Sequence, residues 1–174
     1  MWRPQAGPFV GDGGDRIPTQ LIDLRTPVDR AVLVGAPSRS EARDRADEHL
    51  HELARLTDTA GGEVVGSLVQ RLSAPHPRYY LGEGKARSLG ELVQERGANL
   101  VIFDEELSPA QGKNLEELLQ VRVMDRSELI LDIFATRARS REARMQVELA
   151  QLEYLLPRLR RMWSHLSQIG RAHV

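Results

Sequence analysis

The 174-residue sequence contains no cysteine, which excludes disulfide bonds and thiolate metal sites. No apolar run approaches the roughly 20 residues of a membrane span, and the N-terminus lacks the apolar segment of a signal peptide. The formal net charge is −1, which excludes a polycation that binds nucleic acid over its whole surface. These absences predict a cytoplasmic protein without a membrane span.

Several signatures of catalysis and metal binding are also missing. There is no Gly-x-Ser-x-Gly elbow, and no Walker A loop with four residues between its glycines and a Ser or Thr after the lysine. The five histidines are His49, His51, His76, His165 and His173. No pair of them has the spacing of a zinc site. We therefore predict no catalytic residue, no metal site and no GTP hydrolysis by these residues alone.

Residues 1–27 are rich in glycine, proline and aspartate and poor in apolar residues. Such a composition buries too little surface to offset the entropy lost on ordering. We predict a disordered N-terminal tail.

Residues 28–125 alternate between two patterns. Short apolar runs typical of strands covered on both faces occupy 31–36, 63–70, 100–103 and 121–124. Apolar residues at helical spacing lie between them, over 42–56, 85–96 and 108–119. This alternation predicts an α/β fold with a small four-stranded parallel sheet and right-handed crossovers.

Capping signals predict where helices begin. Ser38 and Glu41 have the spacing of a capping box, and so do Ser108 and Gln111, with proline at the first helical position between them. Asp125 is placed to cap a further helix.

Residues 126–168 are predicted to form a helical arm, whose first buried face is Leu129, Ile130, Ile133 and Phe134. A seam with 4-3 spacing follows, at Met145, Leu149, Leu152, Leu156, Leu159, Trp163 and Leu166. That spacing is typical of one helix of a coiled coil. Pro157 lies inside the pattern and is expected to kink or end the helix. The sequence offers no second helix of matching length, so we expect the seam to lack its partner.

Residues 80–85 (YLGEGK) are a candidate anion site. Backbone N–H groups at a helix start, together with Gly82, Gly84 and Lys85, would suit a phosphate. A plain structural turn explains the same residues. Asp104, Glu105 and Glu106 follow the third predicted strand, where they would hold Mg²⁺, act as acid and base, or form a solvated loop.

Arginines concentrate on the helical arm, in one cluster of Arg137, Arg139, Arg141 and Arg144 and another of Arg158, Arg160 and Arg161. They would neutralise RNA phosphates, with Trp163 stacking on a base and His165 beside it. The alternative is solubility and charge pairing along a coiled coil.

The sequence resembles HflX-type ribosome-associated GTPases from about residue 30 to 168. The likeness is carried by 80–85, 100–111 (LVIFDEELSPAQ), 125–126, 129–134 (LILDIF) and, above all, 147–159 (VELAQLEYLLPRL) with 161–163 and 165–167. The resemblance implies an α/β subdomain, a two-helix coiled coil and then a G domain that binds GTP and Mg²⁺. It also implies binding to the large (50S) ribosomal subunit and its rRNA, and a role in ribosome splitting or rescue.

The family continues after the arm with a Gly-rich tip, a returning helix and the G domain, whereas this chain reads IGRAHV over 169–174. That hexapeptide resembles a translated sequencing adapter, so we expect a non-native tail on a chain truncated before its G domain. Without that domain we expect no bound cofactor. Two alternatives stay open: an ATP-binding α/β domain that uses the 80–85 turn, and a coiled-coil interaction module that self-associates through its seam.

Overall fold

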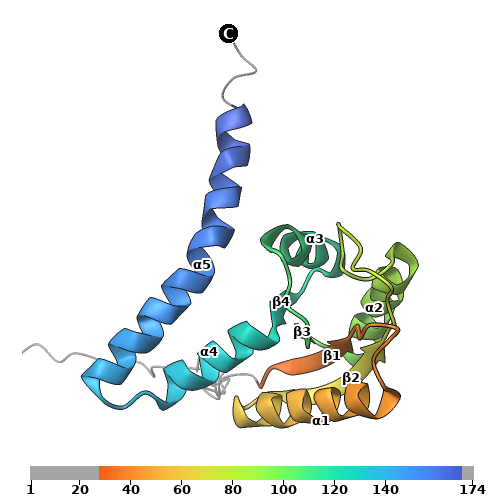
Figure 1. The fold of residues 1–174 in the computed structure, drawn as a ribbon, viewed down its shortest axis with the longest axis horizontal. Helices are drawn as coiled ribbons and strands as arrows, with labels where there is room; N and C mark the ends of the chain where they lie inside the picture. Colours follow the sequence, from red (N-terminus) through yellow and green to blue (C-terminus); the bar gives the residue numbers. More distant parts are fainter. Residues whose placement is uncertain (1–27, 170–174) are drawn as a thin grey trace, which may run out of the picture.

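The computed structural model describes residues 28–169, except for the side chains of Arg43 and of residues 158–169. A four-stranded parallel sheet lies at the centre, and a long helix extends away from it (Figure 1). The strands run in the order β2 (Glu63–Val69), β1 (Arg30–Gly35), β3 (Leu100–Phe103) and β4 (Arg122–Asp125). The predicted α/β fold with a four-stranded parallel sheet is therefore confirmed.

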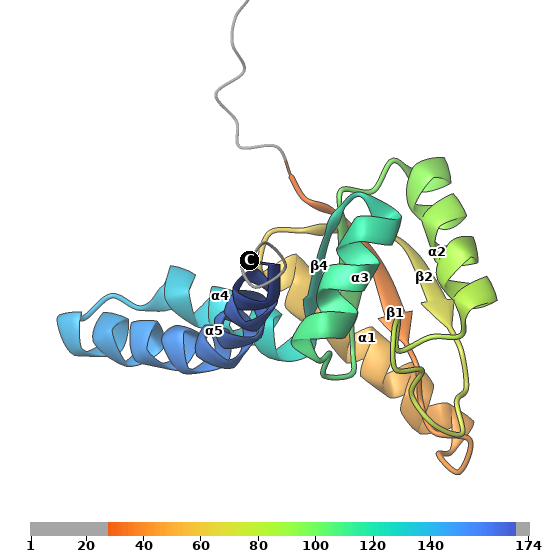
Figure 2. The same cartoon turned by 90° about the horizontal axis from the view of Figure 1, so that it is seen from above.

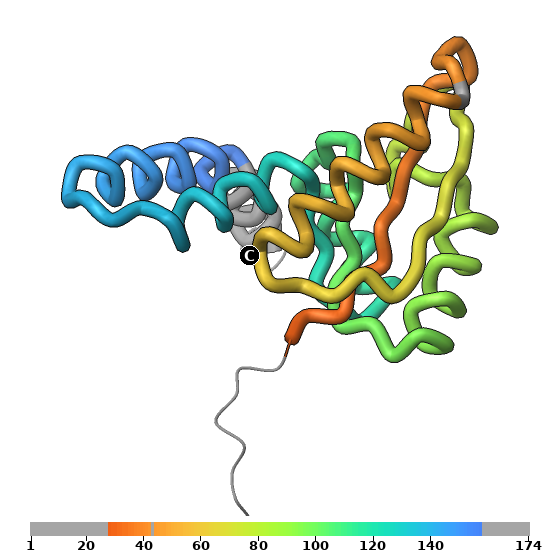
Figure 3. Tube along the Cα trace, turned by 90° about the horizontal axis from the view of Figure 1, so that it is seen from below, coloured from red at the N-terminus to blue at the C-terminus, as the bar shows by residue number. Residues whose placement is uncertain are grey.

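Helices cover both faces of the sheet. α1 (Arg43–Thr59) and α4 (Arg126–Arg137) lie on one face, where Leu53 and Leu129 pack with Leu33 and Ile102. α2 (Glu83–Arg96) and α3 (Pro109–Leu119) cover the other face, which carries Val32, Val34 and Val101. Figure 2 shows α3 in front of the strands, and Figure 3 shows α1 crossing the opposite face. Residues of β1, β3 and β4 alternate between two apolar layers, so these strands read as continuous apolar runs. The prediction of a strand covered on both faces is wrong for the edge strand β2, in which Leu68 is the one buried residue.

The strand order creates a switch point between β1 and β3. The chain leaves β1 toward β2 on one side and leaves β3 toward β4 on the other. The two connections diverge at the carboxyl ends of β1 and β3, and ligands of open α/β sheets bind at such a switch point.

The helix starts agree with the sequence at α3 and α4. Ser108 accepts from the Gln111 N–H at 3.2 Å, and the Gln111 side chain accepts from the Ser108 N–H at 2.9 Å, which completes a capping box. Asp125 caps α4 by accepting from the Glu128 N–H at 3.0 Å.

The capping box predicted at Ser38 and Glu41 is wrong. α1 begins later, after Ala42, and no side chain caps it. Ser38 instead continues the β1–β2 pairing beyond the strands, through a bridge to Leu72. The backbone is held extended there, so the helix cannot start until the bridge ends.

The long helix α5 (Arg141–Ile169) follows α4 after a break at residues 138–140. It continues through Pro157, so the proline does not end it, and Figure 1 shows the helix changing direction along its length. Among the described residues, no helix is long and apolar enough to cross a membrane. The tail predicted over 1–27 and residues 170–174 of the predicted non-native tail lie outside the described residues.

The apolar residues of the arm divide into two groups. Leu129 and Ile133 are buried as predicted. The prediction that Phe134 is a core residue is wrong, because its side chain is 56% exposed. α5 turns Val147 and Ala150 toward α4, where they line a shallow apolar groove together with Leu131 and Phe134. The described seam residues face away from this contact and are exposed: Met145, Leu149, Leu152 and Leu156.

Candidate functional site

Glu105 lies at the switch point, at the carboxyl ends of β1 and β3. Its Oε1 accepts from the backbone N–H of Ala36, just past β1, at 2.7 Å. Its Oε2 is buried and has no hydrogen-bond partner within residues 28–169. The pKa of Glu105 is raised to about 7, mainly by burial; the charges of Asp104 and Glu41 contribute to the rise, and backbone hydrogen bonds oppose it. The interpretation of 104–106 as a solvated loop is wrong for this residue.

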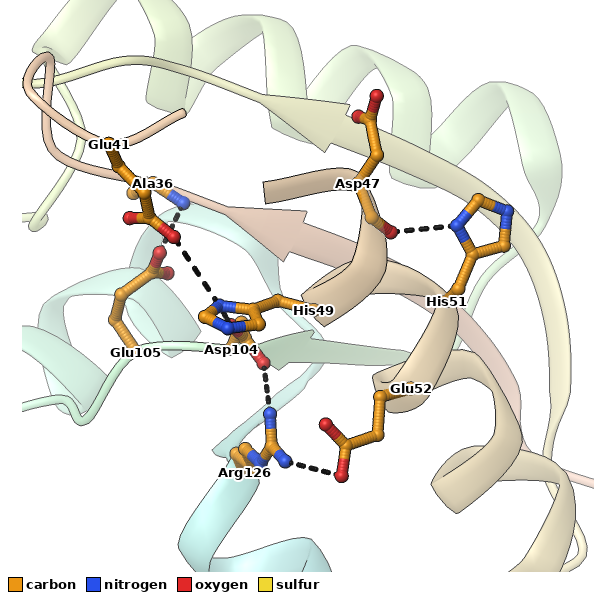
Figure 4. A network of polar contacts seen from close by, with 9 residues as sticks. All are labelled: Ala36, Glu41, Asp47, His49, His51, Glu52, Asp104, Glu105 and Arg126. Atoms are coloured by element: carbon orange, nitrogen blue, oxygen red, sulfur yellow. Dashed lines mark hydrogen bonds and ion pairs between the residues drawn. The ribbon is translucent and has the colours of Figure 1, made fainter. Parts of the chain in front are cut away.

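Asp104 is the centre of a network of charged groups that joins β3 to α1 and α4 (Figure 4). Its Oδ1 accepts from Arg126 Nη1 at 3.1 Å, and Arg126 Nη2 reaches Glu52 Oε1 at 2.8 Å. His49 Nδ1 lies 3.5 Å from Asp104 Oδ2 and 3.6 Å from Glu41 Oε1. The hydrogen bond and charge of Arg126 lower the pKa of Glu52. With Asp104 engaged by arginine, the described side chains form no group of ligands that could hold a metal ion.

The residues proposed for an anion site meet at the start of α2. Gly82 is the N-cap, and its N–H donates to Gln70 Oε1 at 3.1 Å, so this group is already used. Gly84 and Lys85 lie in the first turn, which begins two residues earlier than the sequence predicted. A side chain at Gly84 would meet open space, so the glycine is not required by crowding within the described chain.

Tyr80, beside that helix start, has a left-handed backbone with φ of 63°. The Leu81 N–H donates to the Tyr79 C=O at 2.7 Å, which closes a tight turn around Tyr80. Such a conformation is costly for a non-glycine residue and persists only where neighbours hold it. Two backbone hydrogen bonds between His76 and Tyr80 do so, and the Gln111 side chain fixes the same loop by donating to the His76 C=O at 3.0 Å.

The tyrosine ring also lies at the switch point, at the end of β3. It packs edge-on against Phe103, with ring centroids 6.5 Å apart. Burial raises the pKa of Tyr80, and the charge of Glu105 adds to this effect. The sequence analysis did not predict the strained turn, because no glycine marks the left-handed position. It did not predict the contact of Tyr80 with Phe103 either, because the two residues are distant in the sequence.

A second candidate surface lies where α4 meets α5, and we call it the arginine elbow: Arg137, Arg139, Arg141 and Arg144. All four side chains are exposed, and within residues 28–169 none forms an ion pair. Arg144 Nε donates to the Ala138 C=O at 3.3 Å, which holds one guanidinium over the break. Glu142 is the one acid between 137 and 144, so the elbow presents unneutralised positive charge.

The other predicted RNA-binding residues are placed only by their backbone. They are Arg158, Arg160, Arg161, Trp163 and His165. All five belong to α5, but their side chains are outside the described part of the structure. The seam residues Leu159, Trp163 and Leu166 share this status.

Comparison with known proteins places these features in a family. Residues 47–135 match the family described as GTP-binding GTPase N-terminal, and residues 137–173 match the GTP-binding GTPase middle region. The chain is 44% identical over 140 residues to the GTPase HflX of Flavobacterium psychrophilum, covering 80% of this chain and 34% of that protein. It is 50% identical over 126 residues to the GTPase HflX of Escherichia coli, covering 72% and 30%. It therefore spans about a third of the length of these curated relatives.

A solved structure shares the fold. The GTP-binding protein from Sulfolobus solfataricus, crystallised in complex with GDP, aligns with a TM-score of 0.61 and 26% identity. The alignment covers 79% of this chain and 40% of that one.

Proposed function

Because this chain belongs to the HflX family of GTPases and matches its N-terminal region, we propose that it is the ribosome-binding part of such a protein. It acts in the cytoplasm, binds the large ribosomal subunit through rRNA, and serves in splitting or rescuing ribosomes. GTP hydrolysis belongs to the G domain of the full-length family protein. In this proposal residues 28–125 form the α/β subdomain, and residues 126–168 form the first half of a coiled-coil arm.

The arginine elbow is the observation that carries this proposal. Four exposed guanidinium groups lie within eight residues, at the turn from which the long helix departs (Figure 1). Guanidinium groups without carboxylate partners are free to contact phosphates, and each contact releases counterions from the RNA. Because the net charge of the whole chain is −1, RNA binding would be confined to this arm.

The direct test is co-sedimentation of the chain with purified large subunits over a series of salt concentrations. We expect binding whose affinity falls linearly on a log–log plot against salt. Replacing Arg137, Arg139 and Arg141 by glutamine should weaken binding by about tenfold or more and reduce the salt slope by about 2 to 3.

The matched control removes the same charge from the α/β part. Arg39, Arg45 and Arg87 are exposed arginines outside the arm, and their replacement by glutamine should leave affinity and slope nearly unchanged. Equal effects of the two triple variants would show a nonspecific charge effect. No binding of the unmodified chain at low salt would refute ribosome binding by this region.

The switch point supports a second candidate function, nucleotide binding beside the 80–85 turn. The strained backbone of Tyr80 and the buried carboxyl of Glu105 lie at the switch point, near the start of α2. Backbone N–H groups of Gly84 and Lys85 would receive a phosphate. In an NMR titration with ATP, amide shifts should centre on 82–85; shifts elsewhere alone, or none, would leave the turn purely structural.

A further inference from the structure

Asp125 is a buried carboxylate at the junction of four parts of the chain. It ends β4, is 1% exposed, and caps α4 through the Glu128 N–H at 3.0 Å. Its Oδ2 accepts from the Leu107 N–H, in the segment between β3 and α3, at 3.2 Å. The same oxygen accepts from the Tyr154 hydroxyl of α5 at 2.7 Å. Hydrogen bonds to charged acceptors are about twice as strong as those between neutral groups.

The part of α5 around Tyr154 borders an open cleft. The cleft has a volume of about 520 Å³ and is lined by Glu153, Tyr154 and Pro157 of α5 and by Pro75, Ser108 and Pro109 of the α/β part. The neighbouring leucines of α5 are only partly covered, since Leu152, Leu155 and Leu156 are 49%, 42% and 47% exposed. The hydroxyl of Tyr154 therefore makes a directional contact beside a stretch of helix whose apolar residues remain half exposed.

Pro157 follows Tyr154 by less than one helical turn. A proline has no N–H, so the backbone hydrogen bond that would join residue 157 to the Glu153 C=O is missing. Helices bend at such positions when nothing else fixes them. The tyrosine contact and the weak point of the helix thus lie side by side, where α5 leaves the sheet.

We propose that Tyr154 is a positioning residue, whose hydroxyl, bonded to Asp125, fixes the direction in which the distal half of α5 leaves the α/β part. Without that bond we expect the distal half to take a wider range of directions at Pro157. This inference goes beyond the proposed function, because it concerns the chain alone and needs no ribosome to be true or false.

The variant Tyr154→Phe separates positioning from folding. It removes one hydroxyl, while Asp125 still accepts from the Leu107 and Glu128 N–H groups. The α/β part should stay folded and only the arm should lose its constraint.

Pulsed electron spin resonance between two spin labels gives the direct measurement. The full chain has no native cysteine, so labels can be attached at Gln94→Cys in α2 and Ser167→Cys in α5. About ten residues beyond Pro157 form a lever of about 15 Å, and a bend of about 20° moves its end by about 5 Å. We expect Tyr154→Phe to broaden the distance distribution and to shift its mean by about that amount.

Two controls decide the interpretation. Labels at Gln94→Cys and Glu148→Cys report the first half of α5, beside α4, and their distance should not change. Tyr79→Phe removes a hydroxyl inside the α/β part and should leave both distances as they are. An unchanged 94–167 distribution in Tyr154→Phe overturns the proposal. So does an equal shift of both pairs, because the hydroxyl would then hold the helix as a whole.

Discussion

The α/β part and the arm use apolar residues in opposite ways. In the sheet and its helices, side chains such as Leu33, Leu89 and Phe103 are at most 2% exposed and pack in two closed layers. On α5 the leucines at seam spacing remain about half exposed, next to arginines without ion pairs among the described residues. The apolar core of the first part is covered within the described residues, whereas α5 leaves an apolar seam exposed.

Self-association is the strongest test of this contrast. Each large apolar side chain contributes about 1.5–3 kcal/mol when fully buried, so the exposed seam should drive the 174-residue chain to associate at about 100 µM. Residues 28–138 alone should remain monomeric. Sedimentation velocity of both proteins gives the answer, and Leu149→Glu with Leu156→Glu should restore the monomer. A chain that is monomeric without these changes would show that its seam is covered.

The next largest difference is expected when large apolar side chains are truncated, because the loss of stability should be large in the α/β part and small in the arm. Phe103→Ala deletes a fully buried ring and should lower the free energy of unfolding by about 3–5 kcal/mol. Leu149→Ala removes a side chain that is 57% exposed and should change it by less than about 0.5 kcal/mol. Urea unfolding followed by circular dichroism measures both. Similar losses would mean that the arm contributes to the same core.

The buried carboxyl of Glu105 should make stability depend on pH. The pKa of Glu105 is raised from 4.5 to about 7, so its neutral form is favoured in the folded chain. That contribution is complete below about pH 4.5 and is lost as pH rises through 7. Allowing for the partial exposure of Glu105, we expect Glu105→Gln to stabilise the protein by about 1–2 kcal/mol at pH 8 and little at pH 5.

The neighbouring residue provides the control for this experiment. Glu106 is exposed, so Glu106→Gln should alter urea unfolding equally at the two pH values. If Glu105→Gln behaves in the same way, the carboxyl of Glu105 is solvated in solution.

The smallest effect concerns the two serines with the same capping spacing. Ser108→Ala removes an observed cap and should cost about 1 kcal/mol of stability. Ser38→Ala removes a hydroxyl that lies 2.9 Å from the Ser40 hydroxyl at an exposed position and should cost almost nothing. Thermal unfolding of both variants compares them, and equal losses would contradict the assigned start of α1.

Local patterns predicted the sheet and some helix starts well. The apolar runs located all four strands to within one residue at each end, and Ser108 and Asp125 were recognised as caps. These features depend on neighbours within a few positions. The helix start predicted at Ser38 was wrong, because a bridge to Leu72, far along the chain, outweighed the local preference of serine for an N-cap.

Contacts between distant residues were beyond prediction for the same reason. Glu105 is buried against Ala36, 69 positions away, and Tyr154 meets Asp125, 29 positions away. Nothing in the spacing of these residues encodes either pair. The strained turn at Tyr80 is likewise held by two backbone hydrogen bonds to His76, which Gln111 of α3 fixes in turn, rather than by a glycine.

The break at residues 138–140 has a consequence for proteolysis. It is the non-helical connection between α4 and α5, and Arg137 and Arg139 are exposed there. Trypsin cleaves after arginine and prefers exposed, irregular backbone. A single cut would leave the sheet and its four helices intact and would detach α5 from the polypeptide. Cleavage at this break thus offers a simple way to produce the α/β part without its arm.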